Sequence, residues 1–499
     1  MEMGLHMMTL LKKILVFGFA LAMALPLLAQ LPEVRITITE ADKAQLERDP
    51  LDGPDVLGDF VGGDGVLRAA ADINYRGAWQ LSNLINQKLI QRNWKVKMPK
   101  DNDYRERREW NYNYEEHPRQ VMGYLLMNKA GVPAPSCRHV ILYVNDVLQG
   151  LYVEYEDPDN KKWLTEKFGD NDGDLYKAAL DKPKQQRYFG TLEYLGDQSS
   201  DYFLHYDKKT NNNDEAEFDY RSLMAFTQMI NSTPDEEVLS TYNVNIETQA
   251  FIKYLVVANF ISNWDSYPMR PKNYWLYQNP TNDKWSFIPW DVDATFQPSK
   301  RTFNQMGDKA SIFYQLLKAE AYGAHPEEGN KRPLARRMME QVYFRDAYVR
   351  EYDRALNSYL KEGALVAVLD SLRLIVVTSG VKFGIPNYNR ENDEIKAFIK
   401  TKTASVLVEI ATYAYAPEPI VLGQSDLSAV SFYPNPASES IVFRLAEDQS
   451  IRGEVFDLSC RVVKQFASAQ VAVKDLRPGT YMVKWIVVGE HHVERLIIR

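Results

Sequence analysis

Residues 31–157 alternate between apolar and polar positions over short segments, a pattern that predicts β-strands. One segment departs from this pattern. Val121 and Leu125 recur at helical spacing and Gly131 supplies a stop, which predicts a helix over residues 118–131. The expected strands lie within residues 33–40, 67–77, 92–100, 136–146 and 148–156.

From Asp219 to residue 415 the apolar residues recur every three or four positions, which predicts helices. The segment 263–296, NWDSYPMRPKNYWLYQNPTNDKWSFIPWDVDATF, lies between two of them. The body of the chain is therefore expected to be an α+β structure, with a strand-rich lobe over about 31–157 and a helical lobe over about 219–415. The expected helices lie within residues 221–231, 248–262, 310–323 and 336–360.

The end of the chain has a different pattern. Residues 416–429 are rich in proline, glycine and small polar residues, which predicts a linker. Residues 430–499 then alternate in short runs separated by turns, the pattern of a small antiparallel β-sandwich. Two modules are expected.

Composition places the protein in the globular class. The chain has 499 residues, 45% of them hydrophobic, and a formal net charge of -8 without a long basic run, which argues against nucleic acid as a partner. Lys12 and Lys13 precede an apolar run that closes at Ala29, so residues 1–29 are expected to be a signal peptide. No later apolar stretch is long enough to predict a transmembrane span in the mature chain.

The chain has few cysteine and histidine side chains, so any metal site is expected to use oxygen ligands. Only two cysteines and seven histidines occur, with no HExxH motif, so a zinc site is not expected. In WSFIPWDVD, strand alternation would place Asp291 and Asp293 on one face, where two carboxylates repel unless a cation or proton lies between them. Mg²⁺ is the expected cation. In the alternative, one aspartate caps the following turn and the other faces water.

Asp265 and Asn273 supply further candidate chemistry. An aspartate, a later asparagine and a metal-binding aspartate on the next strand are the groups that phosphoryl transfer requires. A carbohydrate-active site is disfavoured, because Asp291 and Asp293 on one strand face are too close to flank a scissile bond from opposite sides. A lysine on a strand, an isolated helix, a hairpin and a helical lobe follow in the order of a protein-kinase-like fold.

The body resembles the CotH kinase family, the atypical kinases related to spore-coat protein H. The resemblance rests on INYRG with NWKVKMPK, LLMNKAGVPAPSCRHVILYVNDVLQGLYVEYE, GDLYK and, above all, NWDSYPMRPKNYWLY…WSFIPWDVD, and it covers residues 30–415. It implies an atypical protein-kinase-like two-lobe fold that binds ATP with Mg²⁺ or Mn²⁺. It also implies that Asp265 is the catalytic aspartate and that Asn273, Asp291 and Asp293 are metal ligands.

The resemblance also implies nucleotide contacts. Lys95 and Lys97 share a strand face, so alternation does not choose between them; the resemblance favours Lys97 as the phosphate-contacting lysine. Lys177 in GDLYK is a second expected phosphate contact, with an exposed surface lysine as the alternative. Glu156 is an expected nucleotide contact of the hinge, with a solvated loop carboxylate as the alternative.

One segment departs from the family pattern. Members usually carry a glycine- and serine-rich phosphate loop after RG, whereas RGAWQLSNLINQKL has bulky residues and only Ser82. The expected function is nonetheless an exported kinase that transfers the γ-phosphoryl group of ATP to a protein hydroxyl. The alternative is a catalytically inactive kinase-fold protein that binds or adheres at the cell surface.

The tail resembles the C-terminal sorting domain of type IX secretion cargo in Bacteroidetes. The matching segments are SFYPNPASESIVFRL, GEVFDLSCRVVKQF and LRPGTYMVKW. This resemblance implies export through the periplasm to the outer cell surface or medium, with the type IX secretion machinery as a partner. The other expected partner is a protein acceptor or a surface ligand.

Overall fold

The chain forms two compact units, residues 1–413 and 414–499, in a computed structural model. Each is described by itself. The predicted signal peptide, the predicted linker and Cys460 lie outside the described residues. The structure describes residues 31–178, 188–212, 219–298, 306–314, 316–317, 332–381 and 384–413 of the larger unit and 414–415, 432–433, 435–443, 450–457, 462–487 and 490–499 of the smaller one.

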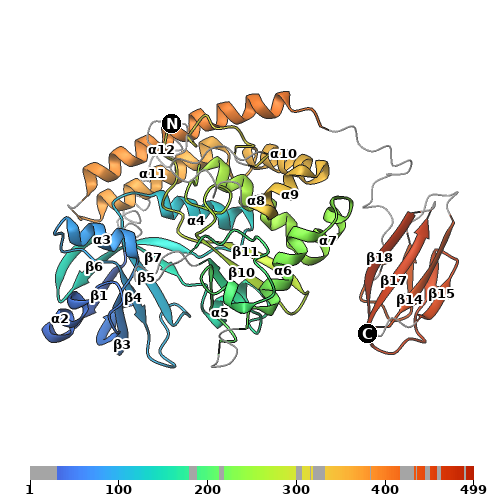
Figure 1. Ribbon diagram of the computed structural model, residues 1–499, viewed down its shortest axis with the longest axis horizontal. Helices are drawn as coiled ribbons and strands as arrows, with labels where there is room; N and C mark the ends of the chain where they lie inside the picture. The colour runs from blue at the N-terminus through green and yellow to red at the C-terminus, as the bar shows by residue number, and fades with distance from the viewer. Residues whose placement is uncertain are drawn as a thin grey trace, which may run out of the picture. The chain divides into compact units, whose positions relative to one another are not determined.

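The strand-rich part of the larger unit is a closed seven-stranded barrel in the order β1-β2-β3-β4-β5-β7-β6 (Figure 1). Apolar side chains at alternate strand positions fill the barrel interior. In β1, for example, Val34 and Ile36 are buried between exposed or half-buried neighbours. The barrel closes where β1 pairs in parallel with β6, while its other pairs are antiparallel. Its strands are Glu33–Thr37, Val56–Val61, Leu67–Tyr75, Trp94–Lys97, Glu109–Tyr114, Cys137–Val144 and Val147–Glu156 for β1 to β7.

Helix α4, Arg119–Ala130, confirms the isolated helix expected over 118–131. Gly131 ends it in a left-handed conformation, with φ of 79°. Nine of its twelve residues are buried, because it packs against strand β6 on one side and against helix α8, Thr248–Phe260, on another. This helix is therefore the junction between the barrel and the rest of the larger unit.

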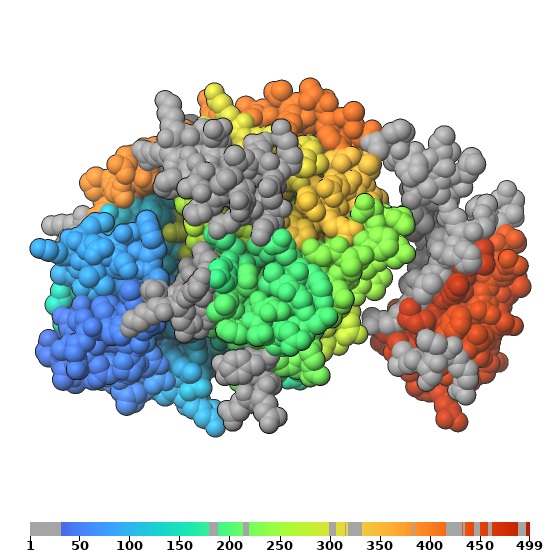
Figure 2. All heavy atoms as spheres, in the orientation of Figure 1, coloured from blue at the N-terminus to red at the C-terminus, as the bar shows by residue number. Residues whose placement is uncertain are grey.

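The remainder of the larger unit combines helices with a four-stranded antiparallel sheet in the order β11-β10-β8-β9. In Figure 2 the barrel (blue) and helices α6 and α7 (green) lie toward opposite sides of the larger unit. The sheet strands are Leu175–Ala178, Tyr206–Lys208, Tyr274–Asn279 and Lys284–Pro289 for β8 to β11. Apart from α4 and α8, the α-helices are α2 Glu40–Arg48, α3 Ala78–Asn86, α5 Lys161–Phe168, α6 Arg221–Ser232, α7 Val238–Asn245, α9 Pro333–Glu340, α10 Val342–Leu356, α11 Glu362–Thr378 and α12 Ile385–Thr412.

Two expected helices differ from the structure. The helix expected over 310–323 is wrong where the chain is described: residues 310–314 and 316–317 form turns. There the Glu409 carboxylate of α12 accepts hydrogen bonds from the Ser311 hydroxyl and the Ile312 N–H. The single helix expected over 336–360 is broken at Gln341 into α9 and α10, since Gln341 adopts an extended conformation with ψ of 121°.

The smaller unit consists of two antiparallel sheets, in the orders β12-β13-β16 and β15-β14-β17-β18. Phe432, Phe443 and Trp485 pack in one apolar core with ring centroids 5.0 to 5.7 Å apart. Within the described residues of both units, no helix is long and apolar enough to cross a membrane. The strands are Phe432–Tyr433, Ser440–Phe443, Ile451–Phe456, Val462–Phe466, Gln470–Ala472, Gly479–Val487 and Glu490–Ile498 for β12 to β18.

Candidate functional site

Asp265 lies in the loop that joins helix α8 to strand β10. Its carboxylate oxygen Oδ2 lies 2.8 Å from Lys272 Nζ and accepts a hydrogen bond of 3.0 Å from the Asn273 side-chain amide. The same amide donates to the Asp265 carbonyl oxygen at 2.8 Å. Asn273 has φ of 58°, a left-handed conformation in which asparagine is enriched. The structure thus brings Asp265 and Asn273 into direct contact.

Asp291 and Asp293 follow strand β11 and do not belong to it. The Trp290 N–H still donates to the Asn273 carbonyl oxygen at 3.0 Å, but Asp291 then turns into the left-handed region with φ of 52°. The expectation that strand alternation places the two aspartates on one face is therefore wrong, because the strand ends before them. They still lie close enough for their charges to interact.

Helix α4 holds the backbone of this segment in place. The Asp291 N–H donates to the Tyr124 hydroxyl at 3.1 Å, and Arg119 Nη1 donates to the Thr295 carbonyl oxygen. Arg119 is itself fixed by Glu391 of α12, whose carboxylate accepts from Arg119 Nε at 2.9 Å. Both ends of the segment that carries the aspartates are thus bonded to one buried helix.

Gly123 allows α4 to approach this segment closely. A Cβ atom at Gly123 would lie 2.8 Å from Val292 Cγ2 and 3.0 Å from the Val292 carbonyl oxygen. Gly123→Ala should lower the free energy of unfolding by about 1–3 kcal/mol, as overpacking typically does, measured by urea denaturation. Gly363→Ala in α11, where a Cβ meets nothing within 4 Å, is the control and should be neutral or stabilising. Equal effects of the two changes would contradict the close contact.

The charges around Asp293 disfavour its ionised form. Burial, with the negative charges of Asp291 and Asp265, raises the pKa of Asp293 well above its usual value, and the positive charge of Lys272 only partly opposes this. A carboxylate in such surroundings is stabilised by a cation or a proton. The electrostatics are thus those expected of a cation site.

Glu115 is a further carboxylate at this site that the sequence reading missed. It directly follows strand β5 and is 3% exposed. Burial raises the pKa of Glu115 well above its usual value, and the negative charges of Asp293 and Asp291 raise it further. We call Glu115, Asp265, Asp291 and Asp293 the acidic cluster. In the described part of the chain, no three His, Cys, Asp or Glu side chains are arranged to bind a metal ion directly. Water or phosphate oxygens would therefore have to complete the shell of any cation at the cluster.

Lys95 and Lys97 do lie on one face of strand β4, but they have different neighbours. Lys95 Nζ lies 2.8 Å from Glu109 Oε2 and 3.3 Å from Asp157 Oδ2, whereas Lys97 Nζ lies 3.4 Å from Glu109 Oε1. Burial opposes the charge of Lys95, but Asp157 and Glu109 outweigh it and raise the Lys95 pKa. Lys97 pairs with the start of strand β5, and Lys95 lies one step nearer its end, where Glu115 follows. Lys95 is therefore the lysine on the side of the acidic cluster.

Two further cations connect Asp157 to the segment that carries the aspartates. Lys177 Nζ lies 5.3 Å from the ring centroids of both Trp275 and Trp290, and the Arg76 guanidinium carbon lies 6.0 Å from the Trp290 ring. Although burial opposes the ionisation of Asp157, Lys95, Lys177 and Arg76 hold its pKa well below its usual range. The structure thus places Lys177 beside the residue that precedes Asp291.

Glu156 is not free to contact a ligand through its side chain. Its carboxylate accepts hydrogen bonds from Arg107 Nε at 3.0 Å, Trp163 Nε1 at 3.0 Å and the Ser136 N–H at 2.8 Å. The side chain is 8% exposed, so Glu156 is not a solvated loop carboxylate. Its role in the structure is to tie strand β7 to its neighbours.

Helix α3 forms the segment after RG, where the sequence departs from the family pattern. After Gly77, which has φ of 76°, residues 78–86 form a helix that includes Ser82, and Trp79 on it is 81% exposed. The segment that departs from the family pattern in sequence therefore also has a regular secondary structure of its own. The segment after RG is a short helix between strands β3 and β4.

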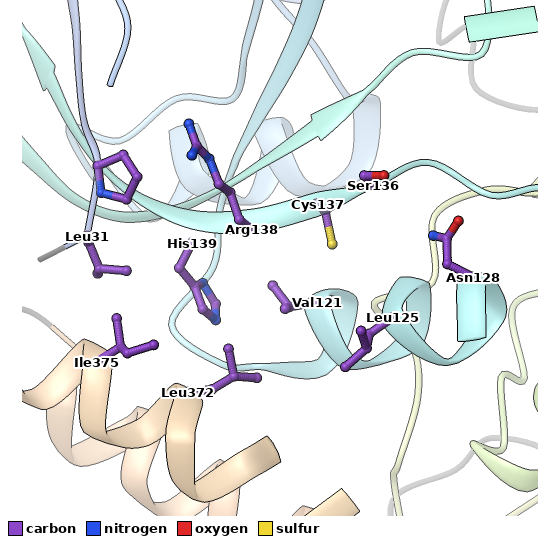
Figure 3. Close-up of a pocket in the computed structure, with 11 residues that line it drawn as sticks. Leu31, Val121, Leu125, Asn128, Ser136, Cys137, Arg138, His139, Leu372 and Ile375 are labelled. Atoms are coloured by element: carbon purple, nitrogen blue, oxygen red, sulfur yellow. The ribbon is translucent and has the colours of Figure 1, made fainter. Parts of the chain in front are cut away.

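A separate cavity of about 570 Å³ lies on the other side of α4 (Figure 3). Val121 and Leu125 of α4, Cys137 of β6 and Leu372 of α11 line it. On a helix, positions 121 and 125 lie roughly opposite position 123, which contacts Val292. The cavity is therefore not part of the acidic cluster.

Comparison with known proteins identifies both units. Residues 73–405 match the family model described as CotH kinase protein. The chain belongs to the CotH kinase family. This match spans α4, the Asp265 loop and the segment that carries Asp291 and Asp293, so the resemblance expected from the motifs is confirmed at the level of the family.

Among curated proteins, the CotH-family chain is 24% identical over 281 residues to inner spore coat protein H of Bacillus subtilis, covering 55% of this chain and 70% of that protein. It is 25% identical over 198 residues to invasin CotH3 of Rhizopus delemar, covering 36% of this chain and 30% of the invasin. A third match, invasin CotH2 of the same organism, is 32% identical over 63 residues, 12% of this chain and 11% of that protein. The chain thus spans only a minor part of the invasins.

Residues 431–499 match the secretion system C-terminal sorting domain. The expected sorting module is thereby confirmed as a family assignment. Such a domain indicates export through type IX secretion to the cell surface, and hence the secretion machinery as a partner. Passage through the periplasm and a Bacteroidetes source stay predictions.

Proposed function

We propose that the larger unit is an atypical kinase that transfers the γ-phosphoryl group of ATP to a protein hydroxyl with Mg²⁺ or Mn²⁺. The observation that carries the proposal is the grouping of Asp265 and Asn273 with Asp291 and Asp293, at the point where α4 joins the barrel to the helices. Membership of the CotH kinase family supports it. In this proposal the barrel and the helical part act as the two lobes of a kinase.

The acidic cluster would supply the metal-binding and proton-accepting groups. Asp291 and Asp293, with the side-chain oxygen of Asn273, would hold the cation, which when bound would neutralise charge on the phosphate oxygens. Asp265 would accept the proton of the acceptor hydroxyl. Its contacts with Lys272 and Asn273 fix the orientation that this role requires.

The basic residues would hold the phosphates. The geometry favours Lys95 over Lys97 for this contact, because Lys95 lies nearer Glu115 along the strand pair and shares Asp157 with Lys177. Lys177 would act from strand β8, beside Trp290. Glu156 would take part only through its backbone, since its carboxylate is already bonded.

Lys95→Met should weaken ATP binding by about tenfold or more, the loss expected for a charged hydrogen bond worth roughly 1.5–3 kcal/mol. Lys97→Met is the matched control on the same strand face and should change ATP affinity much less. Isothermal titration with Mg-ATP measures both. If only Lys97→Met loses ATP affinity, the phosphate contact is made by Lys97, the residue that the family resemblance favours.

A second candidate function follows from helix α3. Because this helix replaces a glycine-rich phosphate loop, the fold would have fewer backbone N–H groups for phosphates, as expected of a kinase-fold protein that binds at the cell surface without turnover. Two of its relatives are named as invasins, and the sorting domain indicates a surface location. In this role the partner would be a surface ligand and not a phosphoryl acceptor.

One experiment separates the two functions. The purified chain is incubated with γ-labelled ATP and MgCl₂ or MnCl₂, and transfer to the chain itself or to added protein is measured. The kinase proposal predicts cation-dependent labelling. Its absence with both cations, in a folded protein, would favour the surface-binding function.

A further inference from the structure

Glu115 is a buried carboxylate without a hydrogen-bond partner. It is 3% exposed, and neither of its carboxylate oxygens has a partner within the described part of the chain. His117 Nδ1 lies 3.7 Å from Glu115 Oε2, beyond hydrogen-bonding distance. Burial and the charge of Arg119 lower the His117 pKa to about 4, so His117 is neutral at pH 7 and does not compensate Glu115.

Glu115 lies just before helix α4, which contacts the segment that carries the aspartates. Glu115 begins the short connection from β5 to α4. The first two turns of α4 bind that segment at three points: Arg119 to Thr295, Gly123 against Val292, and Tyr124 to Asp291. The charges of both aspartates act on Glu115, and Arg76 is the positive charge that acts on it. Glu115 therefore belongs to the same local environment as Asp291 and Asp293.

Within the described residues, no hydrogen bond accounts for this buried carboxylate. Lys95 of strand β4 already pairs with Glu109 and Asp157. A buried carboxylate without a hydrogen-bond partner, on which the charges of two other carboxylates act, is costly. Such groups are usually retained for a bound ion, a water or catalysis. The missing partner is thus expected to be a ligand.

We propose that Glu115 is the third carboxylate of a divalent-cation site with Asp291 and Asp293, where it accepts hydrogen bonds from water bound to the cation. Contact through water fits the arrangement, since the described side chains do not form a direct three-ligand group and Mg²⁺ keeps several of its waters. The inference rests on the cation site of the proposed function. It adds that the strand-rich part contributes to that site, so cation binding would couple the barrel to the helical part.

Binding of MnCl₂ or MgCl₂ alone, without nucleotide, tests this inference. Glu115→Gln keeps the size of the side chain but removes its charge, and it should weaken cation affinity by about 10–100-fold, as loss of an outer-shell partner does. Isothermal titration measures the affinity. Thermal unfolding without cation should show equal or higher stability, because a buried unpaired charge is gone.

Glu116→Gln is the matched control, because the adjacent Glu116 accepts from the Tyr114 hydroxyl and is not part of the acidic cluster. It should bind Mn²⁺ as the wild type does. Cation affinity of Glu115→Gln within twofold of the wild type, or no cation binding by the wild type, would overturn the inference. Since no ATP is present, a loss of cation binding in Glu115→Gln supports the inference even if phosphoryl transfer is never observed.

Discussion

Asp265→Asn should lower the rate of phosphoryl transfer by about 10²–10⁴-fold, the usual contribution of a general base. Asparagine keeps the shape of the side chain and can still accept from Lys272 and Asn273, so the loop should stay folded. It cannot take up the proton of the acceptor hydroxyl. Because an orienting base acts mainly in the transition state, affinity for Mg-ATP should remain nearly unchanged. Labelled ATP measures transfer, and isothermal titration measures affinity.

Asp283→Asn is the control for Asp265→Asn. Asp283 is an exposed aspartate in the turn between strands β10 and β11, so its replacement should leave both transfer and affinity unchanged. Transfer by Asp265→Asn at the wild-type rate would remove Asp265 from the mechanism. Parallel loss of transfer and of thermal stability would assign it a structural role.

Asp291→Asn and Asp293→Asn should each abolish the stabilisation of the protein by Mg-ATP. A ligand at 100 times its Kd stabilises the native state by about 2.7 kcal/mol, and this increment should disappear with the cation site. Without ligand, stability should hold or rise, because Asp291, Asp265 and burial all disfavour the ionised form of Asp293. Thermal unfolding with and without Mg-ATP measures both quantities.

The opposite pattern would assign the aspartates a structural role. If each asparagine variant is less stable without ligand and still responds to Mg-ATP, the carboxylates are structural. This result would favour the alternative that the sequence left open, in which one aspartate caps the following turn and the other faces water. Asp283→Asn is again the control, and it should respond to Mg-ATP as the wild type does. The comparison of Asp291→Asn with Asp293→Asn also shows which aspartate contributes more to cation binding.

Local pattern predicted much of the fold. Helix α4 ends at Gly131 as expected, and Lys95 and Lys97 share one face of β4 because a four-residue strand obeys alternation. Closure of the barrel was not predicted, since the parallel pairing of β1 with β6 joins residues about a hundred positions apart. No local propensity encodes such a contact.

The candidate site shows the same limit. Asp265 and Asn273 could be paired from the sequence because a known motif spaces them, and the structure places them in contact. Strand alternation predicts Asp291 within a strand, but the Asp291 N–H donates to the Tyr124 hydroxyl and not to a neighbouring strand. This hydrogen bond joins residues 167 positions apart, so the local pattern does not predict it. Glu115 was missed because a glutamate before a helix usually faces water; only the packing of α4 shows that this one is buried.

The most direct test of the account is equilibrium binding of ATP to the purified chain, with MgCl₂ in one titration and with EDTA in the other. The account predicts saturable binding that requires the cation and that Asp293→Asn abolishes, whether or not transfer follows. Binding of equal strength in EDTA, or no binding by a folded wild-type chain in MgCl₂, would contradict the claim that the acidic cluster is a metal–nucleotide site.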